Sequence, residues 1–197
     1  MRVCVLAVLM LMGVQAMSEQ THDYPLKPLS FEKVTVEDSF WLPRLRTLKE
    51  VTVPFALDKT EPAVENLRRC ADFLHGRGGE LPFPHRFVSS DLYKVMEGAA
   101  CLLMITPDPG LEKQLDEIID VIADAQQQDG YLYVSHICKV ARPREMGETP
   151  YSWVVHSHEL YNLGHMYEGA IAYFRAISKY KRSPVTRYSL HNASSSS

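Results

Sequence analysis

The sequence lacks several features that assign a chain quickly to a class of protein. Its 21 Lys and Arg nearly balance 24 Asp and Glu, for a formal net charge of -3, and no basic stretch suited to nucleic acid is present. Beyond the first residues, no apolar run is long enough to span a bilayer. Cysteines are few and form no C-x-x-C pair, so we interpret Cys70, Cys101 and Cys138 as buried free thiols. The alternating pattern of strands is almost missing.

The N-terminus has the pattern of a secretory signal peptide. Met1-Arg2 is followed by the apolar run Val3–Val14, and Val14-Gln15-Ala16 offers small residues to a signal peptidase. The run is too short to cross a bilayer comfortably. We predict that residues 1–16 are removed and that the mature chain is secreted or periplasmic, without membrane contact after cleavage. A buried N-terminal helix is the alternative.

The rest of the chain predicts an all-α fold. Residues 17–37 are a Pro-containing, extended leader, in which Phe31–Glu37 alternates weakly and fits one short strand at most. From residue 38 to 182, helical patterns follow one another through short links or loops, which favours antiparallel helix pairs. Residues 183–197 end in four serines and predict a disordered tail. The expected helices are 38–51 with a break at Pro54, 61–75 opened by Pro62, 89–105 capped by Ser90 or Asp91, 109–125 capped by Asp108, and 156–179.

The last helix, His156–Lys179, predicts two different contacts. At about 100° per residue, one broad face is apolar. Another stripe carries polar or small residues, where a solvent-facing stripe would usually carry Lys and Glu. We therefore expect the apolar face to pack on the core and the polar stripe to line a cavity. The apolar face consists of Leu160, Leu163, Tyr167, Ala170, Phe174 and Ile177, and the polar stripe of His158, Asn162, His165 and Gly169.

The histidines of this segment fit three interpretations. A metalloprotease-type zinc site needs two histidines four residues apart, whereas Asn162 stands four residues after His158 and the next histidine is His165. Satisfied polar contacts within a helix pair are a second interpretation. The third is recognition of sugar hydroxyls, which donate and accept hydrogen bonds as His and Asn side chains do. On that interpretation His158, His156 and Asn162 bind substrate.

Two further clusters are candidates for the same pocket. Asp91, Lys94 and Glu97 lie three residues apart on one helical face, where they either pair with one another or contribute Asp91 to a pocket. Gln126 stands where a helix runs into a loop, and free backbone groups at such ends often shape pockets. No pair of carboxylates has a spacing that marks a glycosidase acid and nucleophile.

Four segments in order carry a resemblance. The chain resembles the N-terminal part of glycoside hydrolase family 127, the β-L-arabinofuranosidase-like proteins, from about Leu29 to Ser178. Each segment alone is a weak signal, and four of them at suitable spacing are fairly specific. They are Phe40-Trp41-Leu42-Pro43-Arg44, Ser90–Ala99, Ala125–Leu132 and His158-Glu159-Leu160-Tyr161-Asn162-Leu163-Gly164-His165.

The resemblance implies a fold and a chemistry. The catalytic domain of that family is an (α/α)6 barrel that releases L-arabinofuranose from plant glycans. Its retaining mechanism uses a zinc-bound cysteine as nucleophile and a glutamate as acid/base, with the zinc held by a glutamate and cysteines. What carries over to this chain is part of the substrate pocket, His158 first and then Gln126 and His156.

The sequence departs from the family in one respect. No stretch matches the Cys-rich zinc motif, and Cys70, Cys101 and Cys138 are not in it. We therefore assign no catalytic residue, metal ligand or cofactor to this chain and expect zinc only in the complete family domain. The expectation is an incomplete barrel that binds an arabinose-containing glycan, is inactive alone, and self-associates through the uncovered face of its last helix. A non-catalytic carbohydrate-binding or helical scaffold module is the alternative.

Overall fold

The computed structural model describes residues 26, 29 and 33–182, with side chains up to residue 178. The chain divides into two units, residues 1–34 and 35–197, and every element below belongs to the second. The predicted signal peptide and the predicted tail lie outside the described residues. Residues 33–37 form no strand, so the weak alternation there is not realised. Regular structure in the described part of the chain is helical, which confirms the all-α fold.

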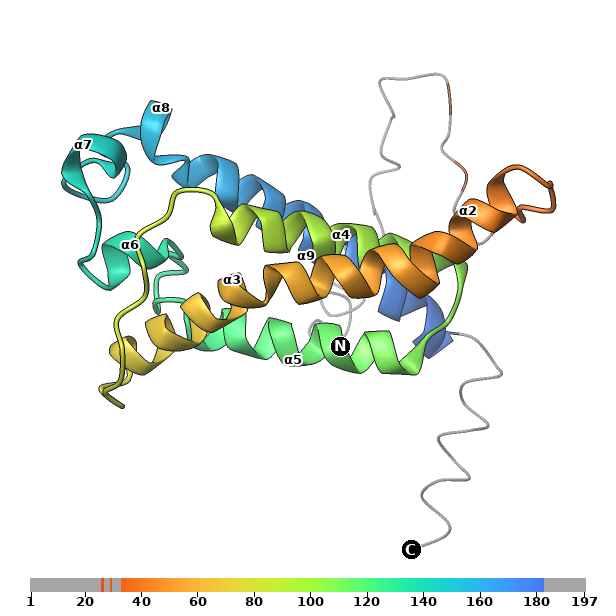
Figure 1. The fold of residues 1–197 in the computed structure, drawn as a ribbon, viewed down its shortest axis with the longest axis horizontal. Helices are drawn as coiled ribbons and strands as arrows, with labels where there is room; N and C mark the ends of the chain where they lie inside the picture. The colour runs from red at the N-terminus through yellow and green to blue at the C-terminus, as the bar shows by residue number, and fades with distance from the viewer. Residues whose placement is uncertain (1–25, 27–28, 30–32, 183–197) are drawn as a thin grey trace, which may run out of the picture. The chain divides into compact units, whose positions relative to one another are not determined.

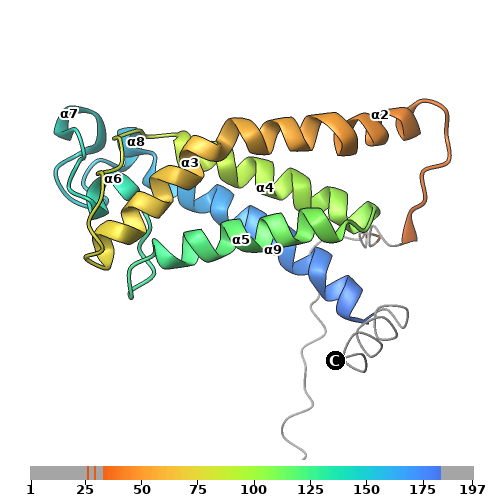
Figure 2. The same ribbon diagram turned by 60° about the horizontal axis from the view of Figure 1, so that its bottom comes forward.

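Four long helices dominate the described part (Figure 1). α3 and α5 run in one direction, since Lys49 pairs with Asp108 near their starts and Arg77 pairs with Asp124 near their ends. α4 and α9 run in the opposite direction, side by side, as Figure 2 also shows. The elements are α2 (Trp41–Thr47), the π-helical turn η2 (Leu48–Thr52), α3 (Val53–Leu74), α4 (Val88–Ile105), α5 (Pro109–Asp124), α6 (Val134–Ile137), α7 (Pro143–Met146), α8 (Val154–Ser157) and α9 (Glu159–Arg182).

The first two predicted helices are one continuous helical rod, from α2 through η2 to α3. Asp38 caps its start as predicted, by accepting hydrogen bonds from the backbone of Phe40 and Trp41. The predicted break at Pro54 and the predicted new start at Pro62 are wrong. The wide turn of η2 just before Pro54 gives room for the proline ring.

Burial explains why α3 continues through Pro62. A proline inside a helix costs about 3 kcal/mol. Val64 and Leu67, which follow it, are fully buried, and each buried side chain of this size contributes about 1.5–3 kcal/mol. Because the apolar stripe runs unbroken on both sides of Pro62, packing outweighs the local penalty.

The starts of α4 and α5 differ in how well the sequence predicts them. Asp108 caps α5 as expected, with Oδ1 accepting from the backbone N–H groups of Gly110 and Leu111 at 3.1 Å. The cap of α4 is neither Ser90 nor Asp91. The ring nitrogen Nδ1 of His85 accepts from the backbone of Phe87 and Val88, at 3.1 and 3.0 Å. An imidazole that caps a helix is rarely read from sequence, because Ser, Thr, Asp and Asn dominate this position.

The polar stripe of the last helix packs against α4, and this corrects the expected cavity. Asn162, Gly169, Ala172, Tyr173 and Ala176 are buried. Gly169 allows the closest approach, since a Cβ placed there would lie 3.1 Å from the backbone oxygen of Tyr93 on α4. Small residues on this side of α9 therefore set the distance between the two helices.

The expected apolar face of α9 is largely exposed. Leu160, Tyr167 and Phe174 of that face are between 52 and 67% exposed, and Ile171, which was not expected in it, lies on the same side and is 51% exposed. Ile177, by contrast, packs against the core. The expectation that part of this face stays uncovered is thus met within the described residues, while self-association stays a prediction. None of the helices in the described part has the length and apolar character needed to cross a bilayer.

The contact at Gly169 predicts opposite effects for one substitution at two glycines of α9. Gly169→Leu places a side chain against the α4 backbone and lowers the free energy of unfolding by about 1–3 kcal/mol. Gly164→Leu is the matched control, because a Cβ there meets nothing within 4 Å. The control gains helix propensity and raises stability by about 0.5–1 kcal/mol. Urea unfolding measures both, and equal effects would show that α9 does not pack closely here.

Candidate functional site

The chain changes direction at His158, between α8 and α9. His158 has φ +60° in the left-handed region, which a residue with a side chain seldom adopts. The single helix predicted from His156 is therefore wrong: α8 ends at Ser157 and α9 begins at Glu159. His156 and His158 lie at a sharp turn instead of on one face of a helix.

A buried carboxylate stands directly after this turn. Glu159 is 3% exposed, and its oxygens accept four hydrogen bonds. The donors are the Tyr131 hydroxyl at 2.6 Å, the Ser157 hydroxyl at 2.7 Å, and the backbone N–H of Tyr151, which lies 3.1 Å from both oxygens. Ionised carboxylates accept such bonds strongly, and without donors a buried charge is very costly. Glu159 therefore ties the loop before α6 and the loop before α8 to the start of α9.

Two tyrosines beside Glu159 are held in their neutral form. Burial, then the hydrogen bond to Glu159, raises the pKa of Tyr131 far above its ordinary value. Burial, then the charge of Glu159, also raises the pKa of Tyr133. The Tyr133 hydroxyl donates to the backbone oxygen of Ser157 at 2.6 Å, just before the turn. Both phenols thus act as fixed donors around the turn at neutral pH.

The side chain of His158 lies among aromatic rings at this junction. Its Nδ1 is 2.7 Å from the backbone oxygen of His156, and its ring meets Phe87 edge to face with centroids 4.4 Å apart. Tyr161 stands on another side, at 5.8 Å. The ring is half-buried, so part of the imidazole remains accessible to a bound molecule.

His156 lies next to His158 and is exposed. Its ring meets Trp153 edge to face, with centroids 4.7 Å apart. Its backbone oxygen accepts a hydrogen bond from Arg86 Nη1 at 3.1 Å. His156, Trp153 and Arg86 therefore form one polar and aromatic surface with His158.

Asn162 is a buried residue that fixes this junction by hydrogen bonds. Its side-chain nitrogen donates to the backbone oxygens of Arg86 and His158, at 2.8 and 2.7 Å, so it joins the segment before α4 to the turn before α9. Asn162 is 3% exposed, and its Oδ1 has no hydrogen-bond partner. The structure thus brings together three of the predicted site residues, His156, His158 and Asn162, with Asn162 in a supporting position.

The other two predicted site residues lie elsewhere. Gln126, after α5, donates from Nε2 to the backbone oxygen of Gly130 at 2.7 Å and so shapes the turn that leads to Tyr131. Asp91 is exposed in the first turn of α4 and pairs with Lys94 at 3.3 Å. The Lys94 ammonium lies 5.0 Å from the Tyr161 ring centre, which links Asp91 to the junction through one intermediate side chain.

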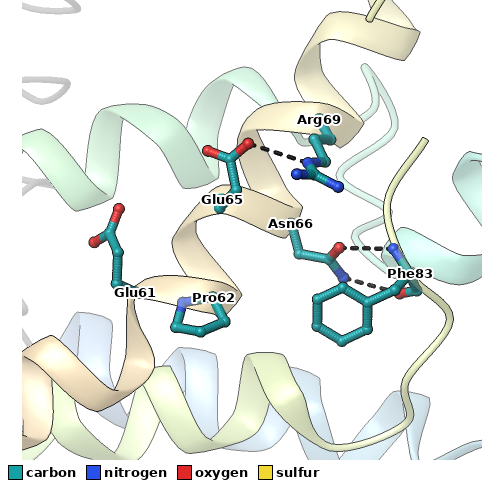
Figure 3. A pocket seen from close by; sticks show the side chains of 6 residues that line it. All are labelled: Glu61, Pro62, Glu65, Asn66, Arg69 and Phe83. Carbon is teal, nitrogen blue, oxygen red and sulfur yellow. Dashed lines mark hydrogen bonds and ion pairs between the residues drawn. The ribbon is translucent and has the colours of Figure 1, made fainter. Parts of the chain in front are cut away.

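A hollow of about 390 Å³ lies between α3 and the loop before α4 (Figure 3). It contains none of the predicted site residues. Asn66 forms part of its wall and is 1% exposed, and its amide makes two hydrogen bonds to the backbone of Phe83, at 3.0 and 2.9 Å. Aromatic contacts then run from Phe83 to His85 and on to Phe87. Asn66 therefore fixes the loop that brings Phe87 to His158.

The described cysteines do not offer the zinc-bound nucleophile that the resemblance implies. A hydrogen bond to the Cys138 thiol, then burial, raises the pKa of the Cys70 thiol, and both residues are buried. Burial, then the charge of Glu97, raises the pKa of Cys101. Within the described residues, no group of three neighbouring metal-ligand side chains contains a cysteine. A zinc ion held by glutamate and cysteines therefore does not fit this part of the chain.

Comparison with known proteins assigns the family. Residues 33–186 match the model of the β-L-arabinofuranosidase GH127 catalytic domain. The chain belongs to this family. It is 34% identical, over 169 residues, to a non-reducing end β-L-arabinofuranosidase of Bifidobacterium longum subsp. longum, a match that covers 71% of this chain and 24% of that protein.

Solved structures support the same assignment for the fold. The GH127 β-arabinofuranosidase BT3674 superposes with a TM-score of 0.68 and 36% identity, over 78% of this chain and 24% of that one. Ara127N-Se, a GH127 β-L-arabinofuranosidase from Geobacillus stearothermophilus T6, superposes with a TM-score of 0.60 and 33% identity. The match covers 73% of this chain and 22% of that one. The GH127 chain described here thus spans about a quarter of the length of these relatives. It corresponds to part of a helical barrel.

Sequence reasoning missed the residues that build the junction. Glu159 follows His158 directly, but an acidic residue at the start of a helix is usually assigned to solvent. Its donor Tyr131 lies 28 residues earlier in the chain, and the sequence does not show that the two residues meet. Arg86 and Phe87 were not predicted either, because only the folded chain brings their loop to the turn.

Tyr131→Phe tests the carboxylate network. Loss of one hydrogen bond to a buried charge lowers the free energy of unfolding at neutral pH by about 1.5–3 kcal/mol. Tyr131 has a raised pKa in the folded state, so its stabilising contribution is complete below about pH 10 and is lost as the pH rises above it, where the unfolded tyrosine ionises first. Above about pH 10 the free energy of unfolding of the variant therefore falls less steeply with pH than that of the parent chain. The difference in slope corresponds to about one bound proton.

Tyr151→Phe is the matched control, since Tyr151 reaches Glu159 through its backbone N–H, which the substitution keeps. Urea unfolding between pH 7 and 11 provides the comparison. Equal losses in the two variants at neutral pH would contradict the role of the Tyr131 hydroxyl.

Proposed function

We propose that this chain provides the sugar-binding part of a glycoside hydrolase that acts on L-arabinofuranosides of plant glycans. The observation that carries the proposal is the junction of α8 and α9, where His158, His156 and Trp153 lie at the surface of a chain that belongs to the GH127 family. Imidazoles donate and accept hydrogen bonds as sugar hydroxyls do, and aromatic rings offer apolar faces beside them. The names of the relatives, β-L-arabinofuranosidases, support the choice of sugar.

In the proposed site His158 is the principal contact to the sugar. The left-handed turn and the contacts to Phe87 and the His156 backbone fix its ring, so little freedom is lost on binding. Asn162 positions this turn and does not touch the sugar, because it is buried. His156 contributes a second imidazole, whereas Gln126 acts through the turn before Tyr131.

We further propose that the chain binds this sugar without hydrolysing its glycosides. The basis is the chemistry of the cysteines: Cys70 and Cys138 are buried, and none of the three forms part of a described metal-ligand group. The hydrogen bond with Cys70 lowers the pKa of the Cys138 thiol, but this thiol is buried and cannot reach a sugar bound at the surface. The proposal therefore assigns sugar recognition to this chain and no chemical step.

The experiment combines binding and turnover on the full chain. Ligand-observed NMR with methyl β-L-arabinofuranoside is expected to show binding, and His158→Gly to weaken it at least about tenfold, the loss of one well-placed polar contact. Glycine suits the positive φ at this position, so the backbone is retained. His75→Ala, at an exposed histidine after α3, is the control that keeps binding unchanged.

Hydrolysis is measured with an aryl β-L-arabinofuranoside in the presence of zinc. No turnover above a heat-treated control is expected. Turnover would contradict the second proposal, while absence of binding, or equal binding by His158→Gly, would contradict the first.

A scaffold or carbohydrate-binding module is the second candidate. The four exposed apolar side chains along α9 favour it, because such a stripe suits a partner surface. Genomic sequence downstream of the coding segment separates the two candidates. An adjacent frame that encodes further barrel helices and a Cys-rich segment supports a part of an enzyme, and its absence supports a module.

We also propose that the protein is secreted or periplasmic, on the basis of residues 1–16. Mass spectrometry of the protein recovered from medium or periplasm is expected to find an N-terminus at Met17. A full-length chain retained in the cytoplasm would contradict this localisation.

A further inference from the structure

A second cluster of polar side chains lies between α4 and α9, about two turns further along α9 from the junction. Glu97 comes from α4, and His165 and Glu168 come from α9. One ligand atom from each of the three residues lies within 4.8 Å of the other two. The Nδ1 of His165 is 3.0 Å from an oxygen of Glu168. None of the steps of the proposed function uses these residues.

The backbone brings the three side chains together. His165 and Glu168 are three residues apart and share one face of α9. Gly169, the next residue, lets α9 approach α4 so closely that a Cβ there would lie 3.7 Å from the backbone nitrogen of Glu97. The distance between the ligands is thus set by helix packing, and only the outer parts of the side chains need to adjust.

The charges of the cluster are unbalanced when the histidine is neutral. Two carboxylates at this separation repel each other unless a positive charge lies between them. Lys94, one turn before Glu97, pairs with Asp91 and faces the Tyr161 ring. A cation among the three ligands would remove the repulsion, and the imidazole itself supplies one only when protonated.

We propose that Glu97, His165 and Glu168 bind a divalent transition-metal ion, with Zn²⁺ as the best match. One imidazole nitrogen and two carboxylate oxygens are ordinary zinc ligands, and three protein ligands leave a fourth, tetrahedral position for water. The set contains no cysteine, unlike the zinc site that the family resemblance implies. The ion joins α4 to α9 and stabilises their contact.

The test is a zinc titration of the full chain by calorimetry near pH 7.5. Binding of one ion per chain is expected, and His165→Ala and Glu97→Gln are each expected to weaken it at least about tenfold, since even supporting residues around a metal contribute 10–100-fold. The Glu97→Gln change replaces one oxygen with nitrogen and retains the shape, so it serves if His165→Ala fails to fold.

A matched control is available at another histidine–carboxylate pair. His75 Nε2 lies 2.9 Å from Asp124 Oδ1, but Arg77 occupies the place of a third ligand there. His75→Ala is expected to leave zinc binding unchanged. Absence of one-to-one binding, or affinities that do not fall in Glu97→Gln and His165→Ala, would overturn the proposal and leave a plain ion pair between His165 and Glu168.

Thermal or urea unfolding with zinc gives an independent readout. An ion that binds the folded chain, present at 100 times its dissociation constant, shifts the unfolding equilibrium about 100-fold toward the folded state. A chelator reverses the shift, and Glu97→Gln shows much less of it. A shift toward the unfolded state would mean that the unfolded chain holds the metal, and this outcome also overturns the site.

Discussion

A carboxylate that is removed from water must be surrounded by donors, and this requirement at Glu159 organises one end of the molecule. Tyr131, Tyr151 and Ser157 supply those donors from segments with little regular structure of their own. An unpaired charge in this position would cost several kcal/mol, a large part of the stability of an ordinary domain. The loops on either side of α6 and α7 are therefore held to α9 by one acidic side chain, with the phenol of Tyr131 kept neutral beside it.

The same requirement places His158. Because Ser157 and Glu159 both face the buried network, the residue between them has to turn outward, and the left-handed conformation achieves this within a single residue. Asn162 then fixes the carbonyl of His158 to the segment that carries Arg86. The orientation of the imidazole thus follows from two buried side chains that come after it on α9, Glu159 and Asn162.

The sequence predicts local features well and long-range ones poorly. Asp108 marks the start of α5, because a cap and its helix lie within a few residues of each other. Pro62 predicts the start of a new helix, and this is wrong, because the burial of residues on both sides of it keeps α3 continuous. α9 packs against α4 on the side of Gly169, because the missing side chain lets the two helices approach closely. The opposite side of α9 is more apolar, yet it stays exposed. At the junction, His156, His158 and Asn162 are found from residue type and resemblance, whereas Glu159 is recognised only when its donors arrive from elsewhere in the fold.

The parallel arrangement of α4 and α9 has a consequence for the order of folding. The bond from Asn162 to Arg86 closes a loop of 76 residues, whereas the bond from Asn66 to Phe83 closes one of 17. Loop-closure entropy grows with the logarithm of length, so the longer closure costs roughly 1.3 kcal/mol more, or about a tenfold lower rate if nothing else differs. Closing the antiparallel pair of α3 and α4 therefore costs less chain entropy than closing the contact of α4 with α9, which encloses α5, α6, α7 and α8 as well. The geometry around His158 depends on the longer of these two closures, because the bond from Asn162 to Arg86 is part of it.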